Sequence, residues 1–196
     1  MILYGTCRCC GDLVQITHDT QHVHPFCPPV GPPSEPPTLA AAALWYASLG
    51  WPVFPLRPGG KQPATRNGFK DATIDPAQIT RWWSAEPNRN IGLPTGVRFD
   101  VIDIDAPEGL ETLRELSAHD RFVHGWVDTA GGGVHLYVKP NGEPNSARWM
   151  PGVDYRGTSG YVVAPPSVRP DGVWRWKHLP SPVITGQGDT FGASCA

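Results

Sequence analysis

The sequence predicts an ordered domain of mixed helices and strands with many loops, and two features of its composition lead to this class. Hydrophobic residues make up 40% of the 196 residues and charged residues only 17%, so the chain can bury a sizeable core. Proline (23) and glycine (22) are well above their usual levels, so much of the chain must form turns and loops. The size favours one main domain with a small appendage.

Charge and hydropathy exclude some classes of protein. The formal net charge is −2, so nucleic-acid binding would have to come from a local basic patch. No stretch approaches the roughly 18 continuous apolar residues of a membrane span, and the N-terminus lacks the layout of a signal peptide. We therefore expect a soluble, intracellular protein with no membrane partner.

The first 27 residues carry a spacing that is typical of a zinc site. A Cys-x2-Cys pair is followed by a His-x2-Cys pair, and the predicted ligands are Cys7, Cys10, His24 and Cys27. Cys9 and His22 are substitute ligands. Zn²⁺ would supply the folding free energy that so short a segment lacks. The alternative is a surface run of reduced thiols with incidental histidines.

A proline-rich spacer separates this module from the rest of the chain. Residues 28–38 contain six prolines and cannot pack as a helix or a central strand. We expect the main domain to cover residues 39–184. Residues 185–196 have little to bury, and we expect them to be disordered.

Local signals predict two helices and a strand early in the main domain. Thr38 is placed to cap an Ala-rich, buried helix over residues 39–49, which Gly50 would end. A short strand follows over residues 51–56. Asp75 is placed to cap a second helix, whose apolar residues lie three and four apart on one face: Ile79, Trp82 and Trp83.

A basic loop lies between that strand and the second helix. Its cations are Arg57, Lys61, Arg66 and Lys70, with no acidic residue among them. Such a loop can hold phosphates, and a solvated surface loop is the alternative on charge alone.

The central stretch, residues 99–107, is predicted to form a strand and carries charges at positions that a buried strand does not normally tolerate. Alternation places Ile102 and Ile104 on one face and Asp103 and Asp105 on the other. Two neighbouring carboxylates repel each other unless a cation lies between them, which favours a divalent metal site. Asp105 has an alternative role as a helix N-cap, because residues 105–108 have the spacing of a capping box.

Further polar residues occur in the strands that follow a helix containing Leu110, Leu113 and Leu116. A glycine-rich turn leads into the strand 134–138, where His135 shares a face with Tyr137. A histidine in a strand is more often a hydrogen-bonded core residue than a catalyst. Asp154 can be a third carboxylate or a turn residue, and an apolar strand after it ends at two prolines.

The order of these pieces resembles that of a known family. Asp103-Ile104-Asp105, the glycine-rich turn with His135, and Val153-Asp154 follow the order of three motifs of the bifunctional DNA primase/polymerase domain, a branch of the archaeo-eukaryotic primase superfamily. The resemblance covers residues 39–184 and includes fragments at residues 50–56, 61–63, 68–73, 91–96 and 164–167. It implies an α+β fold in which an RRM-like antiparallel sheet is backed by helices, with an additional N-terminal α/β unit. In this chain a small zinc knuckle would precede that fold.

The resemblance also implies roles for individual residues. It assigns Asp103, Asp105 and Asp154 to a pair of Mg²⁺ or Mn²⁺ ions and His135 to the nucleotide. The family often has a serine two residues before its histidine, and here Gly133 takes that place. A phosphate contact there would come from backbone N–H groups or another residue. The remaining candidates for contact with the triphosphate are Lys61, Lys70 and Arg156.

We therefore expect a template-dependent DNA primase/polymerase that transfers nucleotides from a dNTP or NTP to a 3′-hydroxyl by a two-metal mechanism. Its partners would be a single-stranded DNA template and a separate helicase, in phage or plasmid replication in the cytoplasm of a prokaryotic cell or phage-infected host. One alternative is a non-catalytic factor that binds single-stranded DNA through basic loops and aromatic residues such as Trp45, Trp82 and Trp174. The other is a metal-dependent nuclease. The carboxylate trio favours the polymerase over the binding factor, because clustered negative charge repels DNA phosphates.

Overall fold

The computed structural model describes residues 3–6, 13–16, 38–116 and 124–180. Of the predicted spacer only Thr38 is described, and the predicted tail lies outside the described residues. The same is true of the predicted zinc ligands Cys7, Cys10, His24 and Cys27 and of the substitutes Cys9 and His22. None of the helices in the described ranges has the length and apolar character that a membrane crossing requires.

A strand pair near the N-terminus was not predicted from the sequence. Strand β1 (Leu3–Thr6) pairs with β2 (Leu13–Ile16) in antiparallel register, with Thr6 opposite Leu13. The residues that join the two strands include Cys7 and Cys10 and lie outside the described ranges.

The two predicted helix caps are both present. Helix α1 (Leu39–Ser48) begins at Thr38, whose hydroxyl accepts a hydrogen bond from a backbone N–H of the first turn at 3.1 Å. It ends beside Gly50, which has the left-handed φ of 74° that favours glycine. Helix α2 (Pro76–Ala85) begins at Asp75, whose carboxylate accepts two backbone N–H groups of the first turn.

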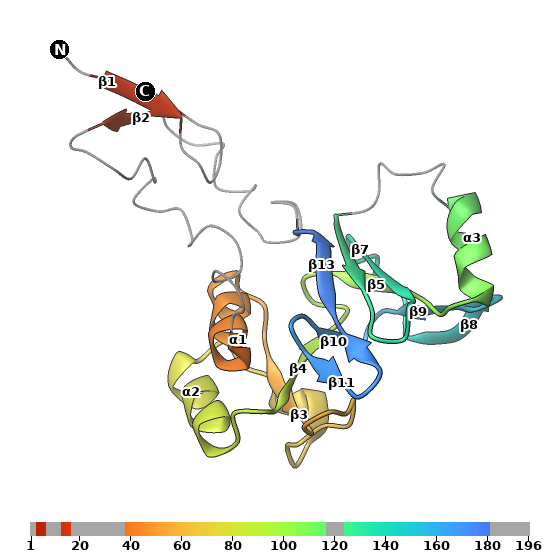
Figure 1. Cartoon of the computed structure of the whole chain (residues 1–196), viewed down its shortest axis with the longest axis horizontal. Helices are drawn as coiled ribbons and strands as arrows, with labels where there is room; N and C mark the ends of the chain where they lie inside the picture. Colours follow the sequence, from red (N-terminus) through yellow and green to blue (C-terminus); the bar gives the residue numbers. More distant parts are fainter. Residues whose placement is uncertain (1–2, 7–12, 17–37, 117–123, 181–196) are drawn as a thin grey trace.

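Both helices pack with a small antiparallel sheet of order β10-β4-β3. Its strands are β3 (Phe54–Leu56), β4 (Asn90–Pro94) and β10 (Tyr161–Ala164). The predicted strand over residues 51–56 is therefore shorter than expected. A 3-10 helix, η1 (Gly68–Asp71), lies in the basic loop after β3. Because β10 comes from late in the chain, this unit joins distant parts of the sequence (Figure 1).

The larger sheet has six strands in the order β13-β6-β7-β5-β9-β8, and every neighbouring pair is antiparallel. Its strands are β5 (Asp100–Ile104), β6 (Gly125–Asp128), β7 (Val134–Val138), β8 (Ser146–Met150), β9 (Val153–Arg156) and β13 (Arg175–His178). A short hairpin of β11 (Val168–Arg169) and β12 (Gly172–Val173) precedes β13. Helix α3 (Glu108–Leu116) lies beside this sheet (Figure 1).

The two faces of the large sheet bury different side chains. Ile102 and Ile104 belong to an apolar cluster that includes Leu110 and Leu113 of α3. The opposite face contributes to the main core, where Trp51 stacks between Tyr46 and Tyr137 with ring centroids 5.8 and 6.0 Å away. The described part of the chain is thus a mixed α/β structure with antiparallel sheets and few helices, as predicted at that level. The RRM-like arrangement and the zinc knuckle stay predictions.

Candidate active site

Three polar residues lie in one row across the middle of the large sheet. Strand β5 places Asp103 opposite His135 of β7 on one side and opposite Asp154 of β9 on the other. These residues are far apart in sequence, and antiparallel pairing brings them together. Because side chains directly opposite each other on neighbouring strands lie close together, the register creates the site.

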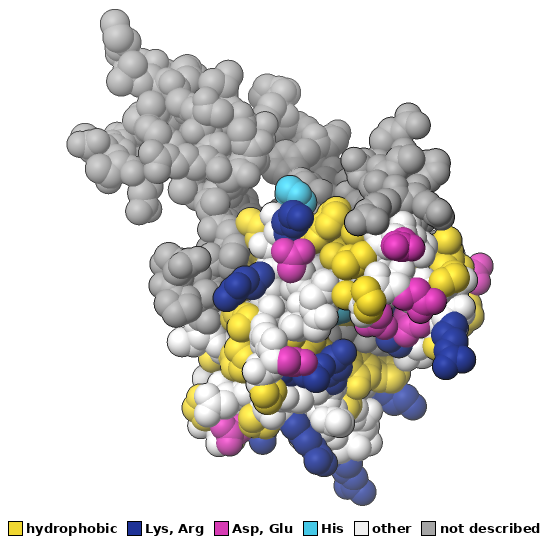
Figure 2. All heavy atoms as spheres, turned by 45° about the vertical axis from the view of Figure 1, so that its right-hand side comes forward, with side chains coloured by type: hydrophobic (Ala, Val, Ile, Leu, Met, Phe, Trp, Pro, Cys, Tyr) yellow, Lys and Arg dark blue, Asp and Glu magenta, His cyan; other side chains and the backbone are white. Residues whose placement is uncertain are grey.

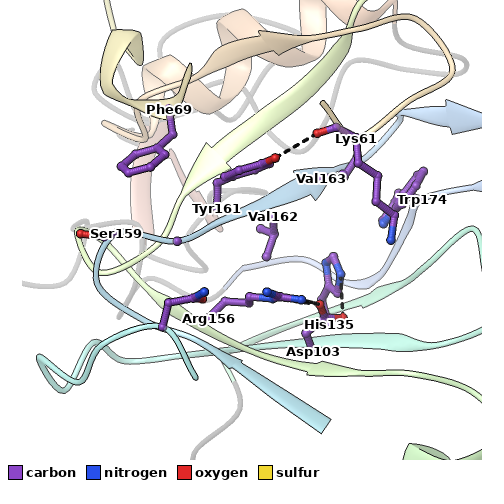
Figure 3. A pocket seen from close by; sticks show the side chains of 12 residues that line it. Lys61, Phe69, Asp103, His135, Arg156, Ser159, Tyr161, Val162, Val163 and Trp174 are labelled. Atoms are coloured by element: carbon purple, nitrogen blue, oxygen red, sulfur yellow. Dashed lines mark hydrogen bonds and ion pairs between the residues drawn. The ribbon is translucent and has the colours of Figure 1, made fainter. Parts of the chain in front are cut away.

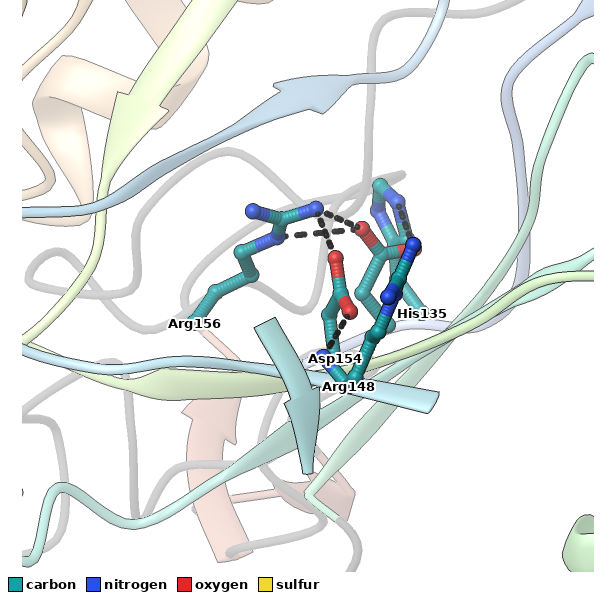
Figure 4. Close-up of polar contacts among 5 residues, drawn as sticks. His135, Arg148, Asp154 and Arg156 are labelled. Carbon is teal, nitrogen blue, oxygen red and sulfur yellow. Dashed lines mark hydrogen bonds and ion pairs between the residues drawn. The ribbon is translucent and has the colours of Figure 1, made fainter. Parts of the chain in front are cut away.

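Arg156 joins the two carboxylates of this row (Figure 4). Its Nη2 lies 3.0 Å from Asp103 Oδ2 and 2.7 Å from Asp154 Oδ2, and its Nε donates to the same oxygen of Asp103 at 3.1 Å. On the other side of Asp103, the Nε2 of His135 lies 3.3 Å from Oδ1. Asp154 also accepts the backbone N–H of Arg148 at 2.7 Å. Each carboxylate therefore has two polar partners.

The surroundings of Asp103 favour its charged form. Burial alone would raise the pKa of this side chain, which is only 16% exposed. The hydrogen bond with His135 and the electrostatic attraction of His135 and Arg156 outweigh burial, so the pKa of Asp103 lies well below its usual range. Asp103 is thus held as a carboxylate at neutral pH.

Asp105 lies just beyond the end of β5 and is exposed. Partial burial and the charges of Asp103 and Asp154 raise its pKa, against the opposing effect of Lys61 and Arg156. Its backbone carbonyl, and not its carboxylate, accepts the N–H of Gly109 at the start of α3. Among the described residues its side chain forms no capping hydrogen bond, so the capping box predicted as an alternative is absent.

A pocket of about 240 Å³ opens between this row and strand β10 (Figure 3). The row contributes Asp103, His135 and Arg156 to its wall. Lys61 enters from the basic loop, with its Nζ 5.8 Å from the ring centroid of Trp174. The remaining lining residues are Phe69, Asn145, Ser159, Gly160, Tyr161, Val162 and Val163. The pocket thus combines cationic, acidic and neutral polar groups.

Two of the predicted nucleotide contacts do not line this pocket. Lys70 is exposed in η1, and Gly133 packs against the backbone of β5. A Cβ at Gly133 would lie 2.2 Å from the carbonyl oxygen of Ile104, so no side chain fits there. A serine side chain at this position would meet the same backbone.

Sequence reasoning missed two neutral polar residues in the pocket wall, Asn145 and Ser159. Ser159 has a φ of 66°, in the left-handed region that is uncommon for residues other than glycine. Such strain is often found at functional sites. The only sequence signal was the glycine-rich context of residues 157–160, which predicts a turn and no particular chemistry.

The aromatic residues named for DNA stacking, under the alternative of a DNA-binding factor, are mostly part of the core, and two of them are therefore unsuited to that role. Trp45 is 7% exposed and Trp174 only 1% exposed, while Trp82 is half-buried. Large aromatic side chains bury most surface when they pack inside, and composition alone cannot tell core from platform. Among the described residues, the aromatic that is well exposed is Trp149, on the edge strand β8.

Comparison with known proteins gives one result. A family model described as bifunctional DNA primase/polymerase, N-terminal (Prim-Pol) matches residues 43–185. This range contains the whole row and every residue of the pocket wall. No curated protein matches the chain.

Proposed function

Because the chain belongs to the family of N-terminal domains of bifunctional DNA primase/polymerases, we propose that it is a template-dependent nucleotidyltransferase. The reaction would join the 3′-hydroxyl of a primer or first nucleotide to a dNTP or NTP and release pyrophosphate. The observation that carries the proposal is the opposed pair Asp103 and Asp154, which lies beside a pocket lined by Lys61, His135 and Arg156.

Asp103, Asp105 and Asp154 are the proposed ligands for Mg²⁺ or Mn²⁺. Their oxygens suit these hard cations, and the opposed pair already attracts a cation, the guanidinium of Arg156. In the described ranges, no three His, Cys, Asp or Glu side chains are grouped as a ready metal site. The chemistry that such ions supply is activation of the attacking hydroxyl and neutralisation of the triphosphate.

We propose that Arg156 has two positions. In the first position, Arg156 neutralises the negative charge of Asp103 and Asp154 and holds the two carboxylates together through contacts of 2.7–3.1 Å. Its side chain is 28% exposed and lines the pocket, so it has room to turn towards a bound triphosphate. A planar guanidinium suits both partners, because it can form paired hydrogen bonds with a carboxylate or a phosphate.

The triphosphate would lie between the basic loop and the row. Lys61 is exposed, reaches the pocket and forms no ion pair with any described residue. His135 can donate from Nε2, and Ser159 and Asn145 offer neutral donors in place of the family's serine. Lys70, and Gly133 through its backbone, remain weaker candidates because they lie outside the pocket wall.

The finer features of the function are proposals that rest on the sequence. We propose that residues 1–27 hold one structural Zn²⁺ and help to start a primer, when no base-paired 3′ end contributes binding energy. We further propose that the protein acts with a separate helicase in the replication of a phage or plasmid, in the cytoplasm of a prokaryotic cell.

The direct test is incorporation of labelled dNTPs and NTPs on primed and unprimed single-stranded templates, with Mg²⁺ and Mn²⁺ compared. Extension that depends on template and metal is expected, and Asp103→Asn is the inactive control. Release of nucleotides from DNA without added triphosphates would support a nuclease instead. DNA binding without either activity would support the non-catalytic factor.

A further inference from the structure

A second hollow, of about 610 Å³, lies between the basic loop and the end of α2. Three arginines line it: Arg57, Arg66 and Arg89. None of the residues that line the catalytic pocket also lines this hollow. The basic loop therefore contributes cations to two separate cavities: Lys61 lines the catalytic pocket, and Arg57 and Arg66 line the hollow.

The backbone explains why these arginines meet. In the β3–β4 pair Leu56 lies opposite Asn90, so Arg57 and Arg89 are the next residues past the end of the same ladder. The guanidinium of Arg89 is held in place, because its Nη1 donates to the carbonyl of Trp82 at 3.1 Å. Arg66 joins them from the loop.

The hollow has a local excess of positive charge. Its one acidic lining residue is Glu86, whose carboxylate accepts the backbone N–H of Asn88 at 3.2 Å. Arg57 and Arg66 are exposed, and neither forms an ion pair within the described part of the chain. The formal net charge of the whole chain is −2, so the positive charge at the hollow is a local excess. In Figure 2, Lys and Arg side chains gather in the lower part of the face that is drawn. Like charges held close together are stabilised by an anionic ligand.

The loop that presents Arg57 and Arg66 is stiffened by hydrogen bonds. The N–H of Arg57 donates to Gln62 at 2.8 Å, and the side chain of Asn90 donates to the carbonyl of Gly60 at 2.9 Å. Near Arg66, the hydroxyl of Thr65 donates to the carbonyl of Gly68 at 2.9 Å. A preorganised loop loses little entropy when a ligand binds.

We infer that this hollow binds the phosphates of a single-stranded nucleic acid, and the inference rests on the proposed function, which supplies such a strand as the template. None of the lining residues is aromatic, so bases find no stacking surface and the sugar-phosphate backbone is the part that fits. The loop would then hold the template backbone on one side and the incoming triphosphate, through Lys61, on the other.

The test measures binding of a labelled oligo-dT to the full chain by fluorescence anisotropy at several salt concentrations, without nucleotide or metal. The test variant is Arg57→Ala/Arg66→Ala. Arg57→Lys/Arg66→Lys keeps the charge, and Arg81→Ala removes an exposed arginine of α2 elsewhere. Arg89 stays unchanged because it anchors the backbone. Loss of two phosphate contacts should lower the salt slope by about 1.4 and weaken binding several-fold, whereas the lysine and Arg81 variants should keep most of the slope.

A salt slope equal to that of Arg81→Ala would overturn the inference. So would a loss of affinity for free ATP or dATP with unchanged binding of oligo-dT, because the occupant would then be a nucleotide. The same measurement on Asp103→Asn separates this result from the proposed function, since strand binding at the hollow does not need an active carboxylate site. Absent incorporation by the unmutated chain would remove the proposed function and leave the binding result standing.

Discussion

Asp103 and Asp154 face each other directly across neighbouring strands, and a single guanidinium nitrogen of Arg156 lies within 3.0 Å of both carboxylates. Two opposed acids on a sheet repel each other, so this pair exists only with a cation beside it. The structure supplies that cation from the same strand as Asp154, two residues further on.

Replacing either member of the pair should abolish nucleotide incorporation. Asp103→Asn and Asp154→Asn keep the shape of the side chain and remove its charge, so we expect losses on the order of 10³-fold or more. The measurement is single-turnover incorporation on a primed template, with circular dichroism as a check on folding. Near-normal activity in either variant would exclude that residue from the metal site.

The lowered pKa of Asp103 predicts a pH dependence of stability. A group whose pKa is lower in the folded state stabilises the fold above its unfolded pKa of about 3.9, and this contribution is lost as the pH falls towards the folded value. Urea unfolding between pH 7 and pH 3, with chelator present, should show a fall in stability below about pH 4. The fall should be smaller in Asp103→Asn, and equal falls in both proteins would contradict the assignment.

Asp105→Asn and Asp105→Ala together separate the metal role of Asp105 from a capping role. The pKa of Asp105 is raised, so its charge opposes folding at neutral pH, and asparagine should leave thermal stability unchanged or slightly higher while incorporation is lost. Asp105→Ala, which also removes any N-cap, should behave in the same way, whereas the loss of an N-cap would lower its stability by about 1 kcal/mol and leave activity intact. Thermal unfolding and incorporation measured on the same preparation distinguish these results.

Arg156→Met should change metal and nucleotide binding in opposite directions. Without the competing guanidinium, the apparent dissociation constant for Mn²⁺, measured by calorimetry without nucleotide, should fall several-fold, while the KM for nucleotide should rise. The thermal midpoint should be lower without metal and recover when Mn²⁺ is added. Arg169→Met, which removes an arginine paired with Asp171 at 3.2 Å, is the matched control. Weaker Mn²⁺ binding in Arg156→Met would refute the two-position proposal.

Ser159 offers a separate test of the pocket wall. Glycine tolerates the φ of 66°, so Ser159→Gly should stabilise the fold by up to about 1 kcal/mol and raise the KM for nucleotide if the hydroxyl contacts a phosphate. Ser159→Ala removes the same hydroxyl and keeps the strain. Equal KM values in all three proteins would exclude the contact.

The N-terminal module should matter for starting a primer and not for extending one. We expect about one zinc per chain, lost on mutation of Cys7, Cys10, His24 or Cys27 but kept in the Cys9 variant. Removal of residues 1–37 should preserve elongation on a primed template and sharply reduce dinucleotide synthesis without a primer. Zinc-free native protein, or full priming by the shortened chain, would count against the module.

Local signals in the sequence predicted the local features of the fold. Thr38 and Asp75 cap their helices as expected, and the alternation along β5 separates Ile104 from Asp103, because caps and strand faces depend on near neighbours. The row of the site depends on which strands pair and in which register. These contacts join residues 103, 135 and 154, and without the family resemblance the sequence would not have grouped them.

The partners of Arg156 and the surroundings of Trp174 could not be predicted from the sequence either, because both depend on contacts between residues far apart in the chain. Arg156 was expected to contact phosphate, and its present contacts with two carboxylates follow from the β5–β9 register. Trp174 was named for base stacking only under the alternative of a DNA-binding factor, and its buried place in the pocket wall follows from the way the end of the described chain returns to the core.

Consecutive segments of the chain form the two walls of the catalytic pocket, since β9 leaves the large sheet at Arg156 and β10 joins the small sheet at Tyr161. The four residues between them close one end of the pocket covalently, as the backbone at Ser159 in Figure 3 illustrates. Under the proposed function, we expect a nucleotide to enter from the opposite end, near Lys61. The length of this connection sets how far apart the walls can stand. A longer or shorter turn at this one place would therefore change the space between the walls and leave every charged residue of the pocket in place.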